Sequence, residues 1–224
     1  MNSVNVRTRQ NVFGAVETNR VLRNTYALLS MTLLWSAFCA GVTMLLELPY
    51  FGVGITLIGY FGLLFLVTRY RNSAVGLIWL FALTGFMGAT LGPILNLYIG
   101  HFANGTELVL TALGGTGFTF LSLSAYALIT RKDFGFMGGM LSAGILVAFL
   151  VSIVAIFMPQ VSGLTLAVSS MFVLLMSGMI LWQTSEIIHG GETNYIMATL
   201  SLYITIYNLF TSLLQILGVL GRDD

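Results

Sequence analysis

Positive charge occupies alternate connections of a chain that is otherwise almost entirely apolar. Basic residues precede the first long apolar run and follow the second and fourth runs, whereas the connections after the first, third and fifth runs contain neither Lys nor Arg. Loops rich in Lys and Arg stay on the cytoplasmic side of a membrane. The pattern therefore predicts a polytopic membrane protein with a cytoplasmic N-terminus. The basic residues concerned are Arg7, Arg9, Arg20, Arg23, Arg69, Arg71, Arg131 and Lys132.

The chain carries too little charge to cover a water-facing surface. Only 8% of its 224 residues are charged and 57% are hydrophobic, whereas a soluble domain has roughly 25% charged residues. The lipid bilayer is therefore the expected surrounding solvent, and no basic patch suggests a nucleic-acid partner. Cys39 is the single cysteine, so neither an intramolecular disulfide nor a cysteine-based metal site is expected.

Seven apolar runs have about the length needed to cross a bilayer. A crossing helix needs about 20 mostly apolar residues, and the second run falls short of this. The sequence predicts an all-α membrane protein with a cytoplasmic N-terminal tail (1–24), a seven-helix transmembrane domain (25–220) and a short C-terminal tail (221–224) on the outside. An even number of spans would return the C-terminus to the cytoplasm without altering the charge bias. The runs are 25–46, 52–68, 74–97, 107–129, 135–157, 163–187 and 195–219.

The last run carries a stripe of polar residues. They recur at steps of four, three, four and three, which places them on one face of a helix. Polar groups without partners are costly in hydrocarbon, so the stripe is expected to face other helices or water. Two interpretations stay open, interhelical hydrogen bonding and the lining of a polar core or pore, and both place this helix at the centre of the bundle. The stripe consists of Ser201, Thr205, Asn208, Ser212 and Gln215.

The third run has the pattern of close helix packing. Gly88 and Gly92 are spaced as small-xxx-small, which lets a second helix approach closely. Pro93 removes a backbone donor and is expected to bend the helix near its outer end. No strand or Lys-Ser/Thr context of a phosphate-binding loop accompanies the glycines, so we interpret all three positions as packing residues.

The sixth run ends in polar and titratable residues, among them Gln183, Glu186 and His189. Glu186 and His189 are three residues apart and share a helix face, as in one half of a carboxylate-bridged dimetal site. The second Glu-x-x-His copy of such a site is absent from the sequence, so no metal is expected. A carboxylate near the membrane is a candidate functional group, which makes Glu186 and His189 the candidate pH sensors.

The residues offer no convincing catalytic arrangement. The chain has two histidines, which the predicted topology places at opposite membrane faces, and it has neither a G-x-S-x-G elbow nor an HExxH motif. We therefore expect no enzymatic activity, no catalytic residues and no cofactor.

Five stretches of the chain resemble the Bax inhibitor 1 family, and within it the bacterial YccA-like branch. Together they span nearly the whole chain beyond the first twenty residues, and the last corresponds to the family's signature helix. The resemblance implies a seven-helix membrane bundle whose last helix is surrounded by the other six, in agreement with the polar stripe. The stretches are RVLRNTY (20–26), TGFMGATLGPILNLY (84–98), RKDFGFMGGML (131–141), HGGETNYI (189–196) and SLYITIYNLFTSLLQILG (201–218).

Some members of the family resemble a pH-sensitive calcium leak channel that uses two aspartates as a proton-sharing pair. The resemblance places Gln183 and Thr205 at these two positions. Neither side chain ionises, so a proton switch based on paired carboxylates is not available there. Glu186 lies one turn from Gln183, but a single carboxylate lacks the coupling of a pair. Leakage of calcium or another cation is therefore the alternative function, with Gln183, Glu186, Thr205 and Asn208 around the path.

The YccA-like branch resembles instead a modulator of FtsH, the membrane-anchored ATP-dependent protease that extracts and degrades membrane proteins. The resemblance implies an inner-membrane protein that binds this protease as a slowly degraded competitor or partner. A flexible cytoplasmic tail and the polar stretch 19–25, which contains no glycine or proline, would offer the protease a handle. A tightly packed, glycine-rich bundle would resist extraction.

Overall fold

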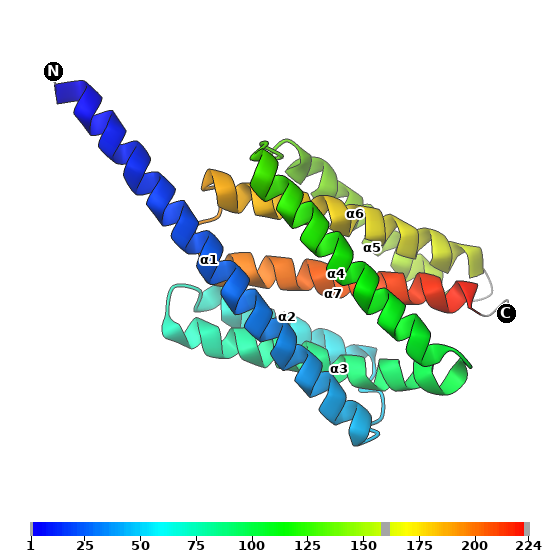
Figure 1. The fold of residues 1–224 in the computed structure, drawn as a ribbon. Helices are drawn as coiled ribbons and strands as arrows, with labels where there is room; N and C mark the ends of the chain where they lie inside the picture. Colours follow the sequence, from blue (N-terminus) through cyan, green and yellow to red (C-terminus); the bar gives the residue numbers. More distant parts are fainter. Residues whose placement is uncertain (1, 158–161, 222–224) are drawn as a thin grey trace.

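The computed structural model describes residues 2–157 and 162–221 (Figure 1). Within these ranges all regular structure is helical and no strand occurs, which confirms the predicted all-α class. The helices are α1 (Asn2–Leu45), α2 (Val53–Arg69), α3 (Ala74–His101), α4 (Gly105–Thr130), α5 (Met137–Phe157), α6 (Ser162–His189) and α7 (Tyr195–Leu220).

The apolar composition explains why these segments are helical. In hydrocarbon, a helix satisfies its backbone polar groups within one segment, which an irregular chain cannot do. In the described part of the chain, six helices are long and apolar enough to cross a membrane, with α1 counted from Thr18. α2 is a shorter apolar helix of 17 residues. The chain is thus a polytopic helical membrane protein with six long candidate spans and one short apolar helix.

α1 is much longer than the first apolar run. It begins at Asn2, so residues 2–24, which we expected to form a flexible tail, continue the helix of the first candidate span. The first 24 residues contain one glycine and no proline, so the sequence offers little to stop a helix once its apolar part has formed. As a result, the N-terminal end of α1 projects beyond the rest of the bundle (Figure 1).

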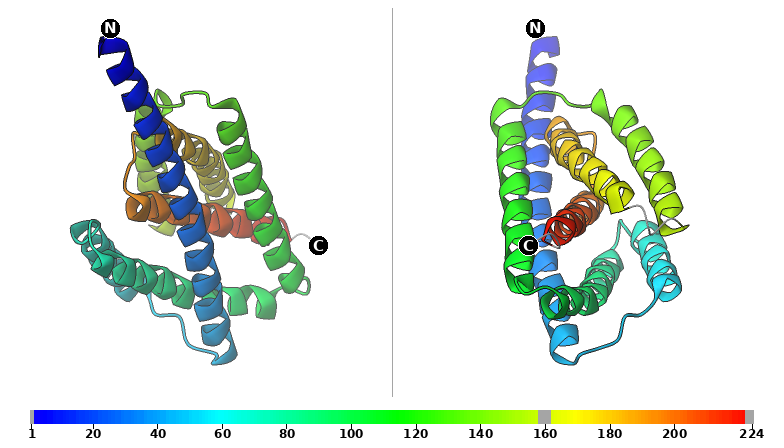
Figure 2. Two further views of the ribbon diagram at one scale, coloured as in Figure 1. Left: turned by 60° about the vertical axis from the view of Figure 1, so that its left-hand side comes forward. Right: turned by 90° about the vertical axis from the view of Figure 1, so that its right-hand side faces the viewer.

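α7 is the central helix of the bundle, as the resemblance implied. The right-hand view of Figure 2 looks along it and shows the other helices arranged around it. Its principal contacts are with α1, α3, α4 and α6, whereas α2 packs on α3 and α5 packs on α6. Four helices therefore pack directly around α7, fewer than the six that the resemblance implied. The other two, α2 and α5, lie outside these four.

The hydrophobic core is assembled on α7. Leu202, Tyr203 and Leu209 of this helix are almost completely buried. The Tyr203 hydroxyl lies 2.7 Å from Oγ of Ser36 on α1 and donates to the carbonyl oxygen of Thr84 on α3 at 3.2 Å. One buried side chain therefore joins three helices through hydrogen bonds that solvent does not weaken.

The connection between α2 and α3 is fixed to the start of α7. Asn194 caps α7, because its Oδ1 accepts from the backbone N–H groups of Ile196 and Met197 at 2.9 and 3.2 Å. Its Nδ2 donates to the carbonyl oxygen of Arg71 and to Oδ1 of Asn72, both at 2.9 Å. A single amide side chain thus serves both as a helix cap and as a bridge between two connections.

The connection between α4 and α5 is fixed to the end of α6. The backbone N–H of Phe134 donates to Oγ of Ser185 at 3.0 Å, and this hydroxyl donates to the carbonyl oxygen of Lys132 at 3.3 Å. Nε2 of His189 lies 3.2 Å from the carbonyl oxygen of Arg131. The basic connections after α2 and α4 therefore lie at the same end of the bundle, the end from which α1 projects.

Candidate functional site

The two positions that the resemblance aligned with the aspartate pair are in direct contact. Nε2 of Gln183 on α6 donates to Oγ1 of Thr205 on α7 at 3.0 Å, and the same hydroxyl lies 3.2 Å from Oε1 of Gln183. Oγ1 of Thr205 is also 2.9 Å from the carbonyl oxygen of Ser201, one turn earlier. Gln183 is 7% exposed and Thr205 is 2% exposed. An amide and a hydroxyl carry no titrating proton near neutral pH, so this pair is a neutral link between α6 and α7.

The remainder of the polar stripe has mixed surroundings. Oε1 of Gln215 accepts from Oγ of Ser169 on α6 at 2.7 Å. Nδ2 of Asn208 donates to a carbonyl oxygen one turn earlier in its own helix at 2.8 Å. Ser212 is buried, Ser201 and Asn208 are half-buried, and Gln215 is exposed. Two members of the stripe, Thr205 and Gln215, thus bind α6, and the stripe follows the α6–α7 contact for part of its length.

A second polar cluster joins three helices next to the Gln183–Thr205 pair. Oγ1 of Thr184 lies 3.4 Å from the Tyr26 hydroxyl on α1 and 3.5 Å from Oγ of Ser124 on α4. Sequence reasoning gave neither Tyr26 nor Ser124 a role. A single hydroxyl in an apolar run has no periodic pattern that would distinguish it, and only the packing of α1, α4 and α6 brings these groups together.

Glu186 and His189 lie at the end of α6 and contact connections there. Nδ1 of His189 is 2.9 Å from the carbonyl oxygen of Ser185, and its Nε2 faces the α4–α5 connection. The carboxylate of half-buried Glu186 lies beside Gly191 in the α6–α7 connection. In the part of the chain that the structure describes, no three His, Cys, Asp or Glu side chains are grouped so as to hold a metal ion. The assignment of Glu186 and His189 as pH sensors stays a prediction.

α1 and α3 approach each other at the two glycines of the third run. A Cβ atom at Gly88 would overlap the carbonyl oxygen of Ser36, and a Cβ atom at Gly92 would overlap Oγ1 of Thr43. Pro93 is buried next to them in α3, which is helical on both sides of it. Both glycines therefore lie where a side chain would separate the two helices.

The geometry limits the chemistry of the Gln183–Thr205 site. Its two side chains can bind and orient polar groups, but they cannot share or release a proton as a carboxylate pair does. The nearest titratable residues of α6, Glu186 and His189, lie one to two turns further along the helix. The site thus has the properties of a fixed hydrogen-bonded contact, and the charged groups of a di-aspartate switch are absent from it.

Comparison with known proteins identifies relatives along nearly the whole chain. Residues 18–222 match the family model described as inhibitor of apoptosis-promoting Bax1. An uncharacterized protein of Pseudomonas aeruginosa is 55% identical over 93% of both chains. The modulator of FtsH protease YccA of Escherichia coli is 51% identical over 93% of this chain and 94% of its own. An uncharacterized membrane protein of Vibrio cholerae is 46% identical over 93% of both chains.

Proposed function

The chain belongs to the Bax inhibitor 1 family, and we propose that it binds an FtsH-type membrane protease and modulates its activity. The observation that carries this proposal is the 51% identity to a protein named as a modulator of FtsH protease, which extends over nearly the full length of both chains. The proposed role is not catalytic: the chain occupies the protease and thereby changes the rate at which other membrane proteins are degraded.

The shape of α1 supports this proposal. Residues 2–17, here called the projecting segment, belong to the N-terminal part of α1 that precedes its apolar run, and they extend away from the bundle (Figure 1). A protease that pulls its substrates out of the membrane needs a terminal segment that it can reach. The projecting segment is such a handle, because the described helices do not surround it.

The packing of α1 inside the bundle supports slow degradation. Behind the projecting segment, α1 is held to α3 by the close approach at Gly88 and Gly92. It is held to α7 by the hydrogen bond between Ser36 and Tyr203. A protease that pulls on the projecting segment would have to break these contacts first. The chain would therefore occupy the protease for longer than a loosely packed substrate does.

We propose a cytoplasmic N-terminus in the bacterial inner membrane. The basic connections after α2 and α4 lie at the end from which α1 projects, and connections rich in Lys and Arg favour the cytoplasmic side. If α2 crosses the membrane as a short seventh span, the C-terminus lies on the opposite side. This orientation would place the projecting segment in the compartment where ATP is available to the protease.

Deletion of the projecting segment tests the proposal. The full-length chain and a variant lacking residues 2–17 are reconstituted with a purified FtsH-type protease in liposomes, and binding and the half-life of each chain are measured. A control variant carries an unrelated helical sequence of equal length in place of the segment. We expect deletion to weaken binding and to change the half-life. Unchanged binding and half-life would show that the segment is not the handle, whereas no binding by the full-length chain would contradict the function itself.

A further inference from the structure

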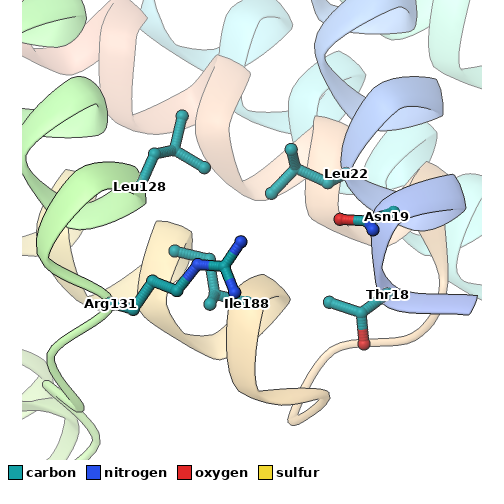
Figure 3. A pocket seen from close by; sticks show the side chains of 6 residues that line it. All are labelled: Thr18, Asn19, Leu22, Leu128, Arg131 and Ile188. Carbon is teal, nitrogen blue, oxygen red and sulfur yellow. The ribbon is translucent and has the colours of Figure 1, made fainter. Parts of the chain in front are cut away.

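A cavity of about 310 Å³ lies between α1, α4 and α6 at the end from which α1 projects (Figure 3). Three of its lining side chains are apolar and three are polar, and one of the polar side chains is a cation. The side chains from α1 face those from the end of α4 and from α6 across it. The lining residues are Thr18, Asn19, Leu22, Leu128, Arg131 and Ile188.

The cavity lies at the expected boundary between hydrocarbon and lipid headgroups. The apolar run of α1 begins at Thr25, about one to two turns after the lining residues of this helix, whereas α4 ends at Thr130 and α6 ends at His189. The lining residues therefore lie in the last turns of α4 and α6, directly after α4, or in the polar turns of α1 that precede its apolar run. A molecule bound at this depth would contact apolar side chains on one side and polar groups on the other, as the headgroup end of a phospholipid does.

Arg131 has an unusual backbone conformation that is fixed from two sides. Its φ of 48° lies in the left-handed region, which residues other than glycine seldom adopt and which costs energy. Its backbone N–H donates to the carbonyl oxygen of Ala127 at 2.9 Å, and Nε2 of His189 lies 3.2 Å from its carbonyl oxygen. The strained residue is thus held in place, and its side chain extends into the cavity (Figure 3).

The guanidinium of Arg131 is available to a ligand. Within the described chain, the hydrogen bonds of this residue are made by its backbone, which leaves the guanidinium donors to the cavity. Asn19 and Thr18 present an amide and a hydroxyl from the opposite wall. A guanidinium binds a phosphate through two parallel hydrogen bonds, and basic pockets between membrane helices on the cytoplasmic side bind lipid headgroups.

We propose that this cavity binds the phosphate of an anionic phospholipid headgroup. Arg131 is the principal contact, Asn19 and Thr18 add hydrogen bonds, and the apolar wall of Leu22 and Leu128 packs against the glycerol and the first carbons of the acyl chains. Phosphate is the chemistry that the polar groups recognise. The apolar wall and the position at the membrane boundary favour a lipid over a free anion. This site is independent of the proposed protease interaction.

The test measures the thermal midpoint of the purified full-length chain in detergent against added phosphatidylglycerol, phosphatidylcholine or inorganic phosphate. We expect phosphatidylglycerol to raise the midpoint more than phosphatidylcholine. Arg131→Gln should weaken the apparent affinity for phosphatidylglycerol about tenfold or more, as the loss of charge-assisted hydrogen bonds implies. The matched control is Lys132→Gln, which removes the same charge from the exposed neighbouring residue outside the cavity lining and should leave the affinity nearly unchanged.

The variant Arg131→Gly distinguishes an effect on lipid binding from an effect on the stability of the fold. Glycine adopts a left-handed conformation without strain, so without lipid this variant should unfold at a higher temperature than Arg131→Gln. It should nevertheless show no greater stabilisation by phosphatidylglycerol than by phosphatidylcholine. If Arg131→Gln and Lys132→Gln weakened the affinity for phosphatidylglycerol equally, the lipid would be attracted to the basic end of the bundle in general. This result would overturn the proposed site. An equal rise in the thermal midpoint with phosphatidylglycerol and phosphatidylcholine would also overturn the proposed site. If inorganic phosphate raised the midpoint as much as phosphatidylglycerol does, the assignment of the ligand to a lipid would be wrong.

Discussion

Gln183 and Thr205 come from different helices and form a buried hydrogen-bonded pair, with 3.0 Å between Nε2 of the amide and Oγ1 of the hydroxyl. The family resemblance places the two aspartates of a proton-sharing switch at these positions. In this chain the side chains at the two positions are in contact, but neither of them is charged. The structure thus shows a neutral hydrogen-bonded contact between α6 and the central helix α7 at these positions.

Removing one partner of this pair should destabilise the protein. Thr205→Val deletes the hydroxyl and leaves the buried amide of Gln183 without its partner, which costs about 1–3 kcal/mol. In the double variant Gln183→Leu, Thr205→Val both polar groups are absent, so it should recover part of this loss. Thermal midpoints in detergent of the two single variants and the double variant measure the coupling between the residues.

Thr211→Val is the matched control for this substitution. Thr211 is half-buried on the same helix, and its hydroxyl bonds to carbonyl oxygens of α7 itself, at 3.0 and 3.1 Å. Its replacement should change stability by no more than about 0.5 kcal/mol. Equal effects of Thr205→Val and Thr211→Val would contradict a specific link between α6 and α7.

Because α1 and α3 approach each other closely, we expect replacement by alanine to change the stability of the protein by very different amounts at different glycines. Gly88→Ala places a Cβ against the backbone of α1 at Ser36, and such overpacking costs about 1–3 kcal/mol. Gly114→Ala on α4 is the control, because a Cβ there meets nothing within 4 Å. The control should be neutral, or stabilising by up to about 1 kcal/mol through helix propensity. Thermal unfolding of both variants measures the difference, and similar midpoints would show that α1 does not pack tightly on Gly88.

The two roles of Asn194 can be separated by substitution. Asn194→Asp keeps an oxygen that accepts from the first N–H groups of α7 but loses the amide that donates to Arg71 and Asn72. Asn194→Ala loses both functions, and loss of the cap alone costs about 0.5–2 kcal/mol. Hydrogen exchange should therefore accelerate in the α2–α3 connection of both variants, but at the start of α7 only in Asn194→Ala. Faster exchange of α7 in Asn194→Asp would mean that the bridge, and not the cap, holds the helix start.

The positions of the helices could be predicted well from the sequence, because a membrane span requires a long run of apolar residues. The seven runs correspond to the apolar parts of α1–α7. The exception is the start of α1, where residues 2–24 are polar and carry no such signal. The short second run was recognised, and the structure gives it as the 17-residue helix α2. The central position of α7 followed from its polar stripe, since polar groups in hydrocarbon need partners inside the bundle.

The partners within the candidate site were much harder to predict. Periodicity placed Thr205 and Gln215 on one face of α7, but only the resemblance pointed to Gln183 as a neighbour of Thr205. The partner of Gln215, Ser169, lies 46 residues earlier in the chain on α6. The Tyr26–Thr184 contact joins residues 158 positions apart. Such pairs depend on how helices rotate and pack, which local patterns in a single sequence do not specify.

The rate at which a purified FtsH-type protease degrades a membrane-protein substrate in liposomes tests the proposed function most directly. Increasing amounts of the full-length chain are added, and the half-lives of the substrate and of the chain are followed together. We predict that the substrate half-life lengthens as the chain is added, while the chain itself is degraded more slowly than the substrate. A substrate half-life that does not depend on the amount of chain would contradict the account.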